Sequence, residues 1–249
     1  RSTLFPYTTL FRSAGKVGVV GFKPDGSGPA EGDDYHKSMG VRLAERGMVV
    51  IAPEQACFGE RRDEQTAASG DPKANTCRHV SFYAQLLGKT VAGMRVWDAM
   101  RAVDVLQSLP EVAANRIGCI GISGGGTTTL FTAALDPRIK AAVVASYFNT
   151  FRDSILAMRH CECNYVPGIL RYAEMPDIAC SIAPRALFVE HGIHDRIFPI
   201  EATKRGLEQL KKAYALLGAE DRLGWDFFDG GHEIHGKRSF DWLASQLGA

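Results

Sequence analysis

The stretch RIGCIGISGGGTTTLFTAALDP, Arg116–Pro137, decides the fold class of this chain. Its first eight residues are apolar over the length of a strand, and the twelve residues from Gly126 onward are typical of a helix. Between the two, Gly121–Gly125 reads GISGG, which matches the pattern G-x-S-x-G. A strand that passes through a tight turn directly into a helix is the context that a nucleophile elbow requires. The stretch therefore predicts an α/β fold with a serine hydroxyl exposed at the turn.

The alternation of strand and helix continues on both sides of this stretch. Short apolar runs bounded by turn residues predict further strands, and longer runs with helical spacing predict helices. The predicted strands cover residues 48–53, 116–123, 139–146, 185–192 and 223–230, and the predicted helices cover residues 35–47, 90–110, 126–137, 200–218 and 237–248. Apolar strands that alternate with helices predict a mostly parallel sheet covered by helices on both faces.

The composition limits the kind of partner. The 249 residues are 45% hydrophobic and 23% charged, as expected for one globular domain with a large core. Lys and Arg number 29 against 28 acidic residues, without a long run of like charge or a basic amphipathic helix. We therefore expect a small-molecule substrate, no nucleic-acid partner and no membrane attachment.

The six cysteines are scattered along the chain. This distribution indicates reduced thiols rather than a disulfide framework, and it slightly favours a cytoplasmic location. The run HCEC, residues 160–163, has metal-binding residue types, but no second Cys or His pair lies nearby at ligand spacing. We therefore expect neither a metal nor another cofactor.

Ser123 is the predicted nucleophile. Gly121 and Gly125 relieve crowding around the strained turn, and the start of the helix supplies N–H groups for an oxyanion, with the N–H of Gly124 as the expected donor. The alternative is a glycine-rich turn that only packs a helix on the sheet or binds phosphate. No Lys follows at the P-loop position and the G-x-G-x-x-G spacing is absent, which favours the nucleophile.

A serine nucleophile needs a histidine base, and that histidine needs a carboxylate. Asp195 follows the predicted strand 185–192, and His232 follows the predicted strand 223–230. The resulting chain order of Ser, Asp and His is that of α/β-hydrolases. His235 is an alternative base, but the glycine pair just before His232 suits a loop that carries this residue over the sheet edge.

Other titratable residues near these loops have a structural interpretation. We expect His191 and His194 to make structural hydrogen bonds. Asp177, Asp226 and Asp229 are alternative acids, which we interpret as a helix cap and surface positions.

With these residues placed, the chain from about residue 14 to its end resembles the dienelactone hydrolase-like branch of the α/β-hydrolase superfamily, which includes acetyl xylan esterase-like proteins. The stretches that carry the resemblance are LAERGMVVIAPEQACFGERR (43–62), GISGGG (121–126), CNYVPGILRYAEMPDIACSIAPRALFVEHGIHDRIFPIEA (163–202) and FFDGGHEIHG (227–236). The resemblance implies a triad of Ser123, Asp195 and His232 that hydrolyses a carboxylic ester through an acyl-enzyme, including deacetylation of a carbohydrate.

Two other functions remain open beside the esterase. Dienelactone hydrolases proper use a cysteine nucleophile, so Ser123 indicates an ordinary serine esterase instead. A serine peptidase of the prolyl-oligopeptidase type shares the triad order, and a non-catalytic binding protein shares the fold.

The first residues of the chain have a different explanation. Residues 3–13, TLFPYTTLFRS, resemble the translation of a widely used sequencing adaptor. We therefore interpret residues 1–13 as an artefact that lies loosely outside the sheet, and residues 14–249 as a single domain that lacks its first strands. The family's HG-type oxyanion loop falls at this point, with only residues 14 and 15 as its remnant. The run KVGVVGF, residues 16–22, is either a strand, by composition, or part of the following loop, by resemblance.

Two features are candidates for substrate binding. Tyr35 and Arg62 lie in loops that face the active site in this fold, although loop arginines more often pair with neighbours such as Glu60. The segment 147–175 lies where the fold commonly inserts a cap, so it either shapes the substrate pocket or is a purely structural excursion.

Overall fold

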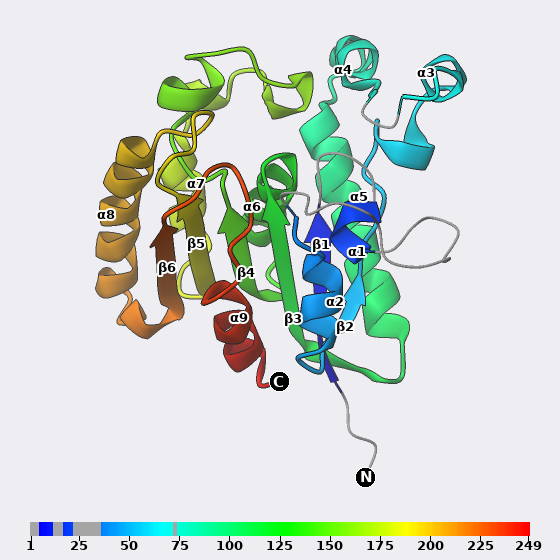
Figure 1. Ribbon diagram of the computed structural model, residues 1–249. Helices are drawn as coiled ribbons and strands as arrows, with labels where there is room; N and C mark the ends of the chain where they lie inside the picture. Colours follow the sequence, from blue (N-terminus) through cyan, green and yellow to red (C-terminus); the bar gives the residue numbers. More distant parts are fainter. Residues whose placement is uncertain (1–4, 12–16, 22–35, 72–73) are drawn as a thin grey trace.

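A computed structural model describes residues 5–11, 17–21, 36–71 and 74–249 (Figure 1). In this part of the chain one six-stranded sheet has the order β2-β1-β3-β4-β5-β6, and all neighbouring strands are parallel. The strands are β1 (Phe5–Phe11), β2 (Val49–Ile51), β3 (Val112–Ile122), β4 (Ile139–Ala145), β5 (Ala186–Gly192) and β6 (Leu223–Phe228). The α-helices are α1 (Val17–Val20), α2 (Met39–Ala44), α3 (Glu64–Ala68), α4 (Cys77–Leu86), α5 (Val91–Ser108), α6 (Gly124–Leu135), α7 (Met175–Cys180), α8 (Ile200–Leu216) and α9 (Ser239–Leu247). Short 3-10 or π turns are η1 (Gly59–Arg61), η2 (Phe151–Ile155), η3 (Glu162–Asn164), η4 (Ile169–Arg171) and η5 (Glu220–Arg222).

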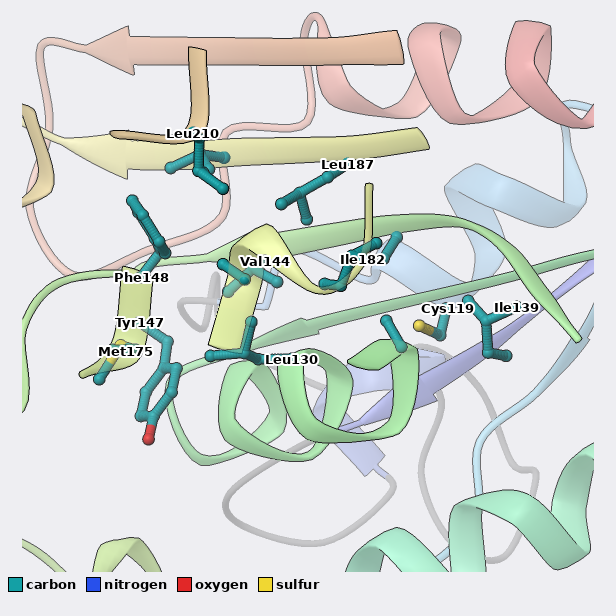
Figure 2. Packing of buried hydrophobic residues seen from close by; sticks show 14 of the residues in the cluster. Cys119, Leu130, Ile139, Val144, Tyr147, Phe148, Met175, Ile182, Leu187 and Leu210 are labelled. Atoms are coloured by element: carbon teal, nitrogen blue, oxygen red, sulfur yellow. The ribbon is translucent and has the colours of Figure 1, made fainter. Parts of the chain in front are cut away.

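The central strands serve two separate cores. On β4, Ala142 and Val144 belong to a core that includes residues of α5, α6, α7 and α8. Ala141 and Val143 of the same strand belong to a second core with α2 and α9. Because successive strand residues point to opposite faces, an unbroken apolar strand supplies both layers. Figure 2 shows the first core, where side chains from β4, β5, α6 and α8 approach one another. The predicted α/β architecture is confirmed.

The strand β1 corrects one expectation. Tyr7 of β1 pairs with Val49 of β2 on one side and with Ile117 of β3 on the other, so β1 lies inside the sheet. The prediction of a segment lying loosely outside the sheet is therefore wrong for Phe5–Phe11, while residues 1–4, 12 and 13 lie outside the described residues. Parallel pairing is made by backbone groups, so an extended segment can occupy this position. The adaptor origin of the segment stays a prediction.

The other elements follow the predicted pattern with two differences. The five predicted strands correspond to β2 to β6, and the five predicted helices overlap α2, α5, α6, α8 and α9, with α6 beginning two residues before its predicted start. The strand predicted in residues 16–22 is wrong for Val17–Val20, which form the short helix α1, while residues 16 and 22 lie outside the described residues. The helices α3, α4 and α7 lie outside the predicted helices.

The sheet brings three loops to one edge. Since β3, β5 and β6 are parallel, their carboxyl ends lie at the same edge of the sheet (Figure 1). This edge is where ligands bind in open α/β sheets. The loops that leave it carry Ser123, Asp195 and His232.

Candidate active site

The turn at Ser123 has the geometry of a strained elbow. Ser123 directly follows β3 and is the N-cap residue of α6, with φ 56° and ψ −124°. A positive φ is costly for a residue other than glycine, and such strain clusters at functional sites. The Ser123 N–H donates to the carbonyl of Ala145 at 3.1 Å, which fastens the turn to the end of β4. The residue is partly exposed, as a nucleophile must be.

Close packing of the backbone explains why glycine stands at positions 121 and 126, on either side of the elbow. A Cβ on Gly121 would lie 2.3 Å from the carbonyl oxygen of Gly125 and 2.7 Å from Oγ1 of Thr129. A Cβ on Gly126 would lie 2.5 Å from Cβ of Tyr147. Any side chain at Gly121 or Gly126 would therefore push α6 away from the sheet.

His232 and Asp195 form a hydrogen-bonded pair. Nδ1 of His232 lies 2.7 Å from Oδ2 of Asp195. The other oxygen of Asp195 accepts the N–H groups of Ile197, at 2.8 Å, and Phe198, at 3.2 Å. Burial works to raise the pKa of Asp195, but the hydrogen bonds from His232 and the two N–H groups outweigh it and hold the pKa below its ordinary value.

The ionised carboxylate decides the tautomer of the histidine. A carboxylate only accepts hydrogen bonds, so Nδ1 of His232 carries the proton that points at Asp195. Nε2 is then left as an acceptor. The pair therefore presents a basic nitrogen of the kind that can take a proton from a serine.

The alternative base, His235, belongs to a second pair. Its Nδ1 lies 2.8 Å from Oδ2 of Asp226, and its ring stacks on Phe228 with centroids 4.5 Å apart. Asp226 lies within β6 rather than in a loop at the carboxyl edge, and it is only 8% exposed. The prediction of a surface position is therefore wrong for Asp226. The residue predicted as acid, Asp195, pairs with His232 rather than with His235.

The remaining alternatives have structural contacts. Nε2 of His191 lies 2.7 Å from the carbonyl oxygen of Phe198, inside the core. His194 pairs with Asp229 at 2.8 Å on the surface. Asp177 completes a capping box at the start of α7. These contacts match the structural hydrogen bonds, the surface position and the helix cap that were predicted.

An aromatic residue beside the pair, Phe198, was not predicted from the sequence. The ring of Phe198 stacks on His232 with centroids 5.8 Å apart and an interplanar angle of 14°. The Phe198 ring also contacts the rings of Tyr147 and His160, whose centroids lie 5.3 Å and 5.4 Å from its own. Burial lowers the pKa of His160, which favours its neutral form. No motif marks Phe198, apart from its position shortly after Asp195.

Glu190 holds the loop that carries the histidines. It lies in β5 and is fully buried. Its Oε1 accepts the N–H of His235 at 2.8 Å, and its Oε2 accepts the N–H of Gly236 at 2.9 Å and the hydroxyl of Ser239 at 2.5 Å. Burial raises the pKa of Glu190, against the effect of these donors. The only signal in the sequence is a charged residue in the middle of an apolar strand.

The predicted substrate contacts divide into two cases. The guanidinium of Arg62 donates to the carbonyls of Gly59 at 2.8 Å, Asp71 at 2.6 Å and Ala74 at 3.3 Å. These bonds organise a loop, and nothing in the geometry directs Arg62 to a substrate. Tyr35 lies outside the described residues, as do residues 14 and 15, the predicted remnant of the oxyanion loop.

The predicted cap segment lines an open pocket of about 330 Å³. Apolar side chains of η2, of η4 and of the turn before η4 form much of its lining, including Phe151, Ile155, Pro167 and Ile169. The polar residue Asn164 also lines it and bonds to Thr127 of α6 at 3.0 Å. The segment therefore shapes a pocket, and its use by the substrate stays a prediction.

Comparison with known proteins finds similarity to an esterase family and to a hydrolase. The acetyl xylan esterase (AXE1) family matches residues 89–175, a range that contains the elbow at Ser123. The chain is 34% identical over 197 residues to "Putative hydrolase YtaP" of Bacillus subtilis, which covers 77% of this chain and 62% of that protein. The chain thus spans less than two thirds of the length of this relative.

Solved structures show the same fold. A structure titled as a putative acetyl xylan esterase from Bacteroides fragilis matches with a TM-score of 0.70 and 20% identity, over 91% of this chain and 59% of that one. A glucuronoyl esterase from Solibacter usitatus matches with a TM-score of 0.68 and 17% identity, over 98% of this chain and 74% of that one. In the described residues no helix combines the length and apolarity needed to cross a membrane. The predicted α/β-hydrolase fold and the predicted resemblance to acetyl xylan esterase-like proteins are confirmed.

Proposed function

We propose that this chain, with its α/β-hydrolase fold and its resemblance to acetyl xylan esterases, is a serine-dependent carboxylic ester hydrolase. The observation that carries the proposal is the 2.7 Å hydrogen bond between His232 and Asp195, whose loops leave the same sheet edge as the strained turn at Ser123. The match of residues 89–175 to acetyl xylan esterases supports the same activity.

The proposed reaction passes through an acyl-enzyme. Oγ of Ser123 attacks the ester carbonyl while Nε2 of His232 accepts the hydroxyl proton. Asp195 stabilises the positive charge that develops on the imidazole. The N–H of Gly124, at the start of α6, donates to the oxyanion. His232 then returns the proton to the leaving alcohol, and a water molecule activated by the same nitrogen releases the acid.

We propose esters of carbohydrates as the substrate class, with acetyl esters first. Proteins with related sequence or the same fold are named acetyl xylan esterase and glucuronoyl esterase. An acetyl group needs little room, so the specificity of such an enzyme depends on the alcohol side of the ester. The apolar pocket in the segment 147–175 is the candidate for binding that side.

The test combines covalent labelling with kinetics. A fluorophosphonate probe should label the wild-type chain and leave Ser123→Ala unlabelled. On p-nitrophenyl acetate, Ser123→Ala and His232→Ala should each lower kcat by about 10³ to 10⁶, and the double variant should be little worse than either alone. His235→Ala is the matched control, because it removes the neighbouring imidazole and its pair with Asp226.

Each outcome decides between functions. Activity retained in His232→Ala and lost in His235→Ala would reassign the base. Labelling of Ser123 together with faster cleavage of a peptide p-nitroanilide than of the ester would favour a serine peptidase. No labelling and no turnover in a folded protein would leave a non-catalytic binding protein.

A further inference from the structure

Three cysteine sulfurs meet outside the proposed triad. Cys77 begins α4, and Cys161 and Cys163 lie at and within η3. Their Sγ atoms all lie within 4.8 Å of one another, with Cys161 and Cys163 3.1 Å apart. All three are free thiols; Cys77 and Cys163 are buried, and Cys161 is partly buried. Segments far apart in the sequence therefore bring three soft ligand atoms to one point.

A fourth cysteine adjoins this group. Cys57, in the loop after β2, is 2% exposed, and its thiol lies beside that of Cys77. Its φ of 76° is a left-handed backbone conformation that is uncommon for a residue with a side chain. Its carbonyl accepts the N–H of Thr76 at 3.1 Å, which ties the strained loop to the start of α4. The strain is thus located where Cys57 lies beside Cys77, one of the three grouped cysteines.

A buried arginine, Arg95, lies beside the sulfurs. Arg95 is 2% exposed and donates twice to the carbonyl of Ala56, at 3.1 and 2.9 Å, and once to Sγ of Cys77 at 3.3 Å. Its guanidinium also lies over the ring of Phe58 at 4.5 Å. In the described part of the chain no carboxylate lies within ion-pair distance of it.

The grouping of the sulfurs suits a metal centre. Three soft ligand atoms within 4.8 Å of one another match a thiolate site for a divalent metal. Thiolates at this spacing repel one another unless a cation lies between them, and a divalent metal both binds thiolates and separates their charges.

We propose that Cys77, Cys161 and Cys163, with Cys57 as fourth ligand, bind one thiolate-preferring divalent metal of the zinc class. With zinc–sulfur bonds of about 2.3 Å, neighbouring sulfurs of a tetrahedral site lie about 3.8 Å apart. The 3.1 Å contact and the 4.8 Å limit observed here lie on either side of that spacing. Four thiolates and one divalent ion leave a double negative charge, which Arg95 partly neutralises while donating to Cys77, as outer-shell donors do at metal–thiolate sites.

The proposed metal is structural, and it is separate from the ester hydrolysis. Four protein ligands leave no open position for a substrate. Asn164, next to Cys163, accepts a hydrogen bond from Thr127 of α6 at 3.0 Å and donates to the carbonyl of Cys161 at 3.1 Å. The metal would thus fix η3 against the helix that Ser123 begins. The expectation of no metal rested on ligand spacing near HCEC, whereas Cys57 and Cys77 come from far upstream.

The test measures metal binding on the full chain. Wild-type protein, reduced and freed of metal, is titrated with Co²⁺ and then with Zn²⁺. We expect ultraviolet thiolate-to-cobalt absorption and tetrahedral visible bands, displacement by zinc, and one zinc retained per chain after gel filtration. Cys163→Ser should lose retention at least tenfold, and Cys180→Ser, a half-buried cysteine of α7 outside the group, should keep it.

Several results would overturn the proposal. These are cobalt spectra without thiolate bands in the wild type, zinc retention equal in Cys163→Ser and wild type, and a disulfide between Cys161 and Cys163 in freshly purified protein. If Cys163→Ser does not fold, the cobalt spectra and the zinc content of the wild-type protein still test whether the metal binds. Because none of these readouts uses esterase activity, failure of the metal site is distinguishable from failure of the proposed function.

Discussion

Glu190 allows a sharp test of how the fold positions the proposed base. Its carboxylate, buried in β5, accepts the N–H groups of His235 and Gly236 and the hydroxyl of Ser239. His232 lies in the same loop, three residues before His235. We therefore expect Glu190→Ala to lower both stability and activity, although Glu190 touches neither Ser123 nor the substrate in the proposed mechanism.

The size of the effect follows from the donors that lose their acceptor. Glu190→Ala removes the acceptor of two backbone N–H groups and of the Ser239 hydroxyl. Counting about 2 kcal/mol for each N–H alone, the free energy of unfolding should fall by about 4 kcal/mol. For a domain of this size that is a decrease in Tm of about 8 to 16 °C. Glu190→Gln keeps one carbonyl oxygen and should show about half the loss. A displacement of His232 by about 1 Å would lower kcat about 10²-fold.

The pH dependence gives a second readout with a definite sign. Burial raises the pKa of Glu190 above its ordinary value of 4.5, so the folded state binds this proton more tightly than the unfolded state does. The resulting stability is fully present below pH 4.5 and is lost as the pH rises through the folded-state pKa. The destabilisation caused by Glu190→Ala should therefore shrink as the pH rises.

The assays are thermal unfolding at several pH values and hydrolysis of p-nitrophenyl acetate. Glu233→Gln is the control, because Glu233 lies in the same loop but forms a part-exposed ion pair with Lys37 at 2.7 Å. Loss of such a pair costs at most about 1 kcal/mol. Unchanged Tm and kcat in Glu190→Ala would refute the positioning role. A destabilisation that grows with pH would show that the three donors outweigh burial, and that the pKa of Glu190 is lowered.

Two further substitutions test the pair and the elbow. Asp195→Asn keeps an oxygen for its backbone donors but presents an amide N–H to Nδ1 of His232, which moves the ring proton to Nε2; kcat on p-nitrophenyl acetate should fall about 10⁴-fold with the fold retained, and a loss below tenfold contradicts the tautomer argument. Gly121→Ala places a Cβ 2.3 Å from the carbonyl oxygen of Gly125, so thermal unfolding should show a loss of about 1 to 3 kcal/mol or more. Gly231→Ala, with no atom within 4 Å of its Cβ, should change stability by less than about 0.5 kcal/mol, and equal effects at the two glycines would count against close packing as the reason for Gly121.

The features that the sequence predicted correctly are local ones. The strand, turn and helix around Ser123 follow from apolar runs and glycines that are neighbours in the chain, and the strained turn appears as expected. The parallel sheet follows from repeated alternation of such runs, because each apolar strand must be covered on both faces. The order of Ser123, Asp195 and His232 indicated the proposed triad for the same reason, since each follows a predicted strand.

The sequence alone did not determine which distant groups meet. His232 and His235 each form a hydrogen bond with a different aspartate, Asp195 and Asp226. Which histidine pairs with which aspartate is decided by the packing of β5 and β6. The stack of Phe198 on His232 likewise has no sequence signal.

Two larger features depended on tertiary structure for the same physical reason. The segment Phe5–Phe11 occupies the sheet position between β2 and β3, where its backbone pairs with both neighbours. Cys77 meets Cys161 and Cys163 because α4 packs on η3, a contact between segments that spacing rules do not connect. Local periodicity encodes which residues form an element, whereas the meeting of side chains from separate elements is decided only when those elements pack.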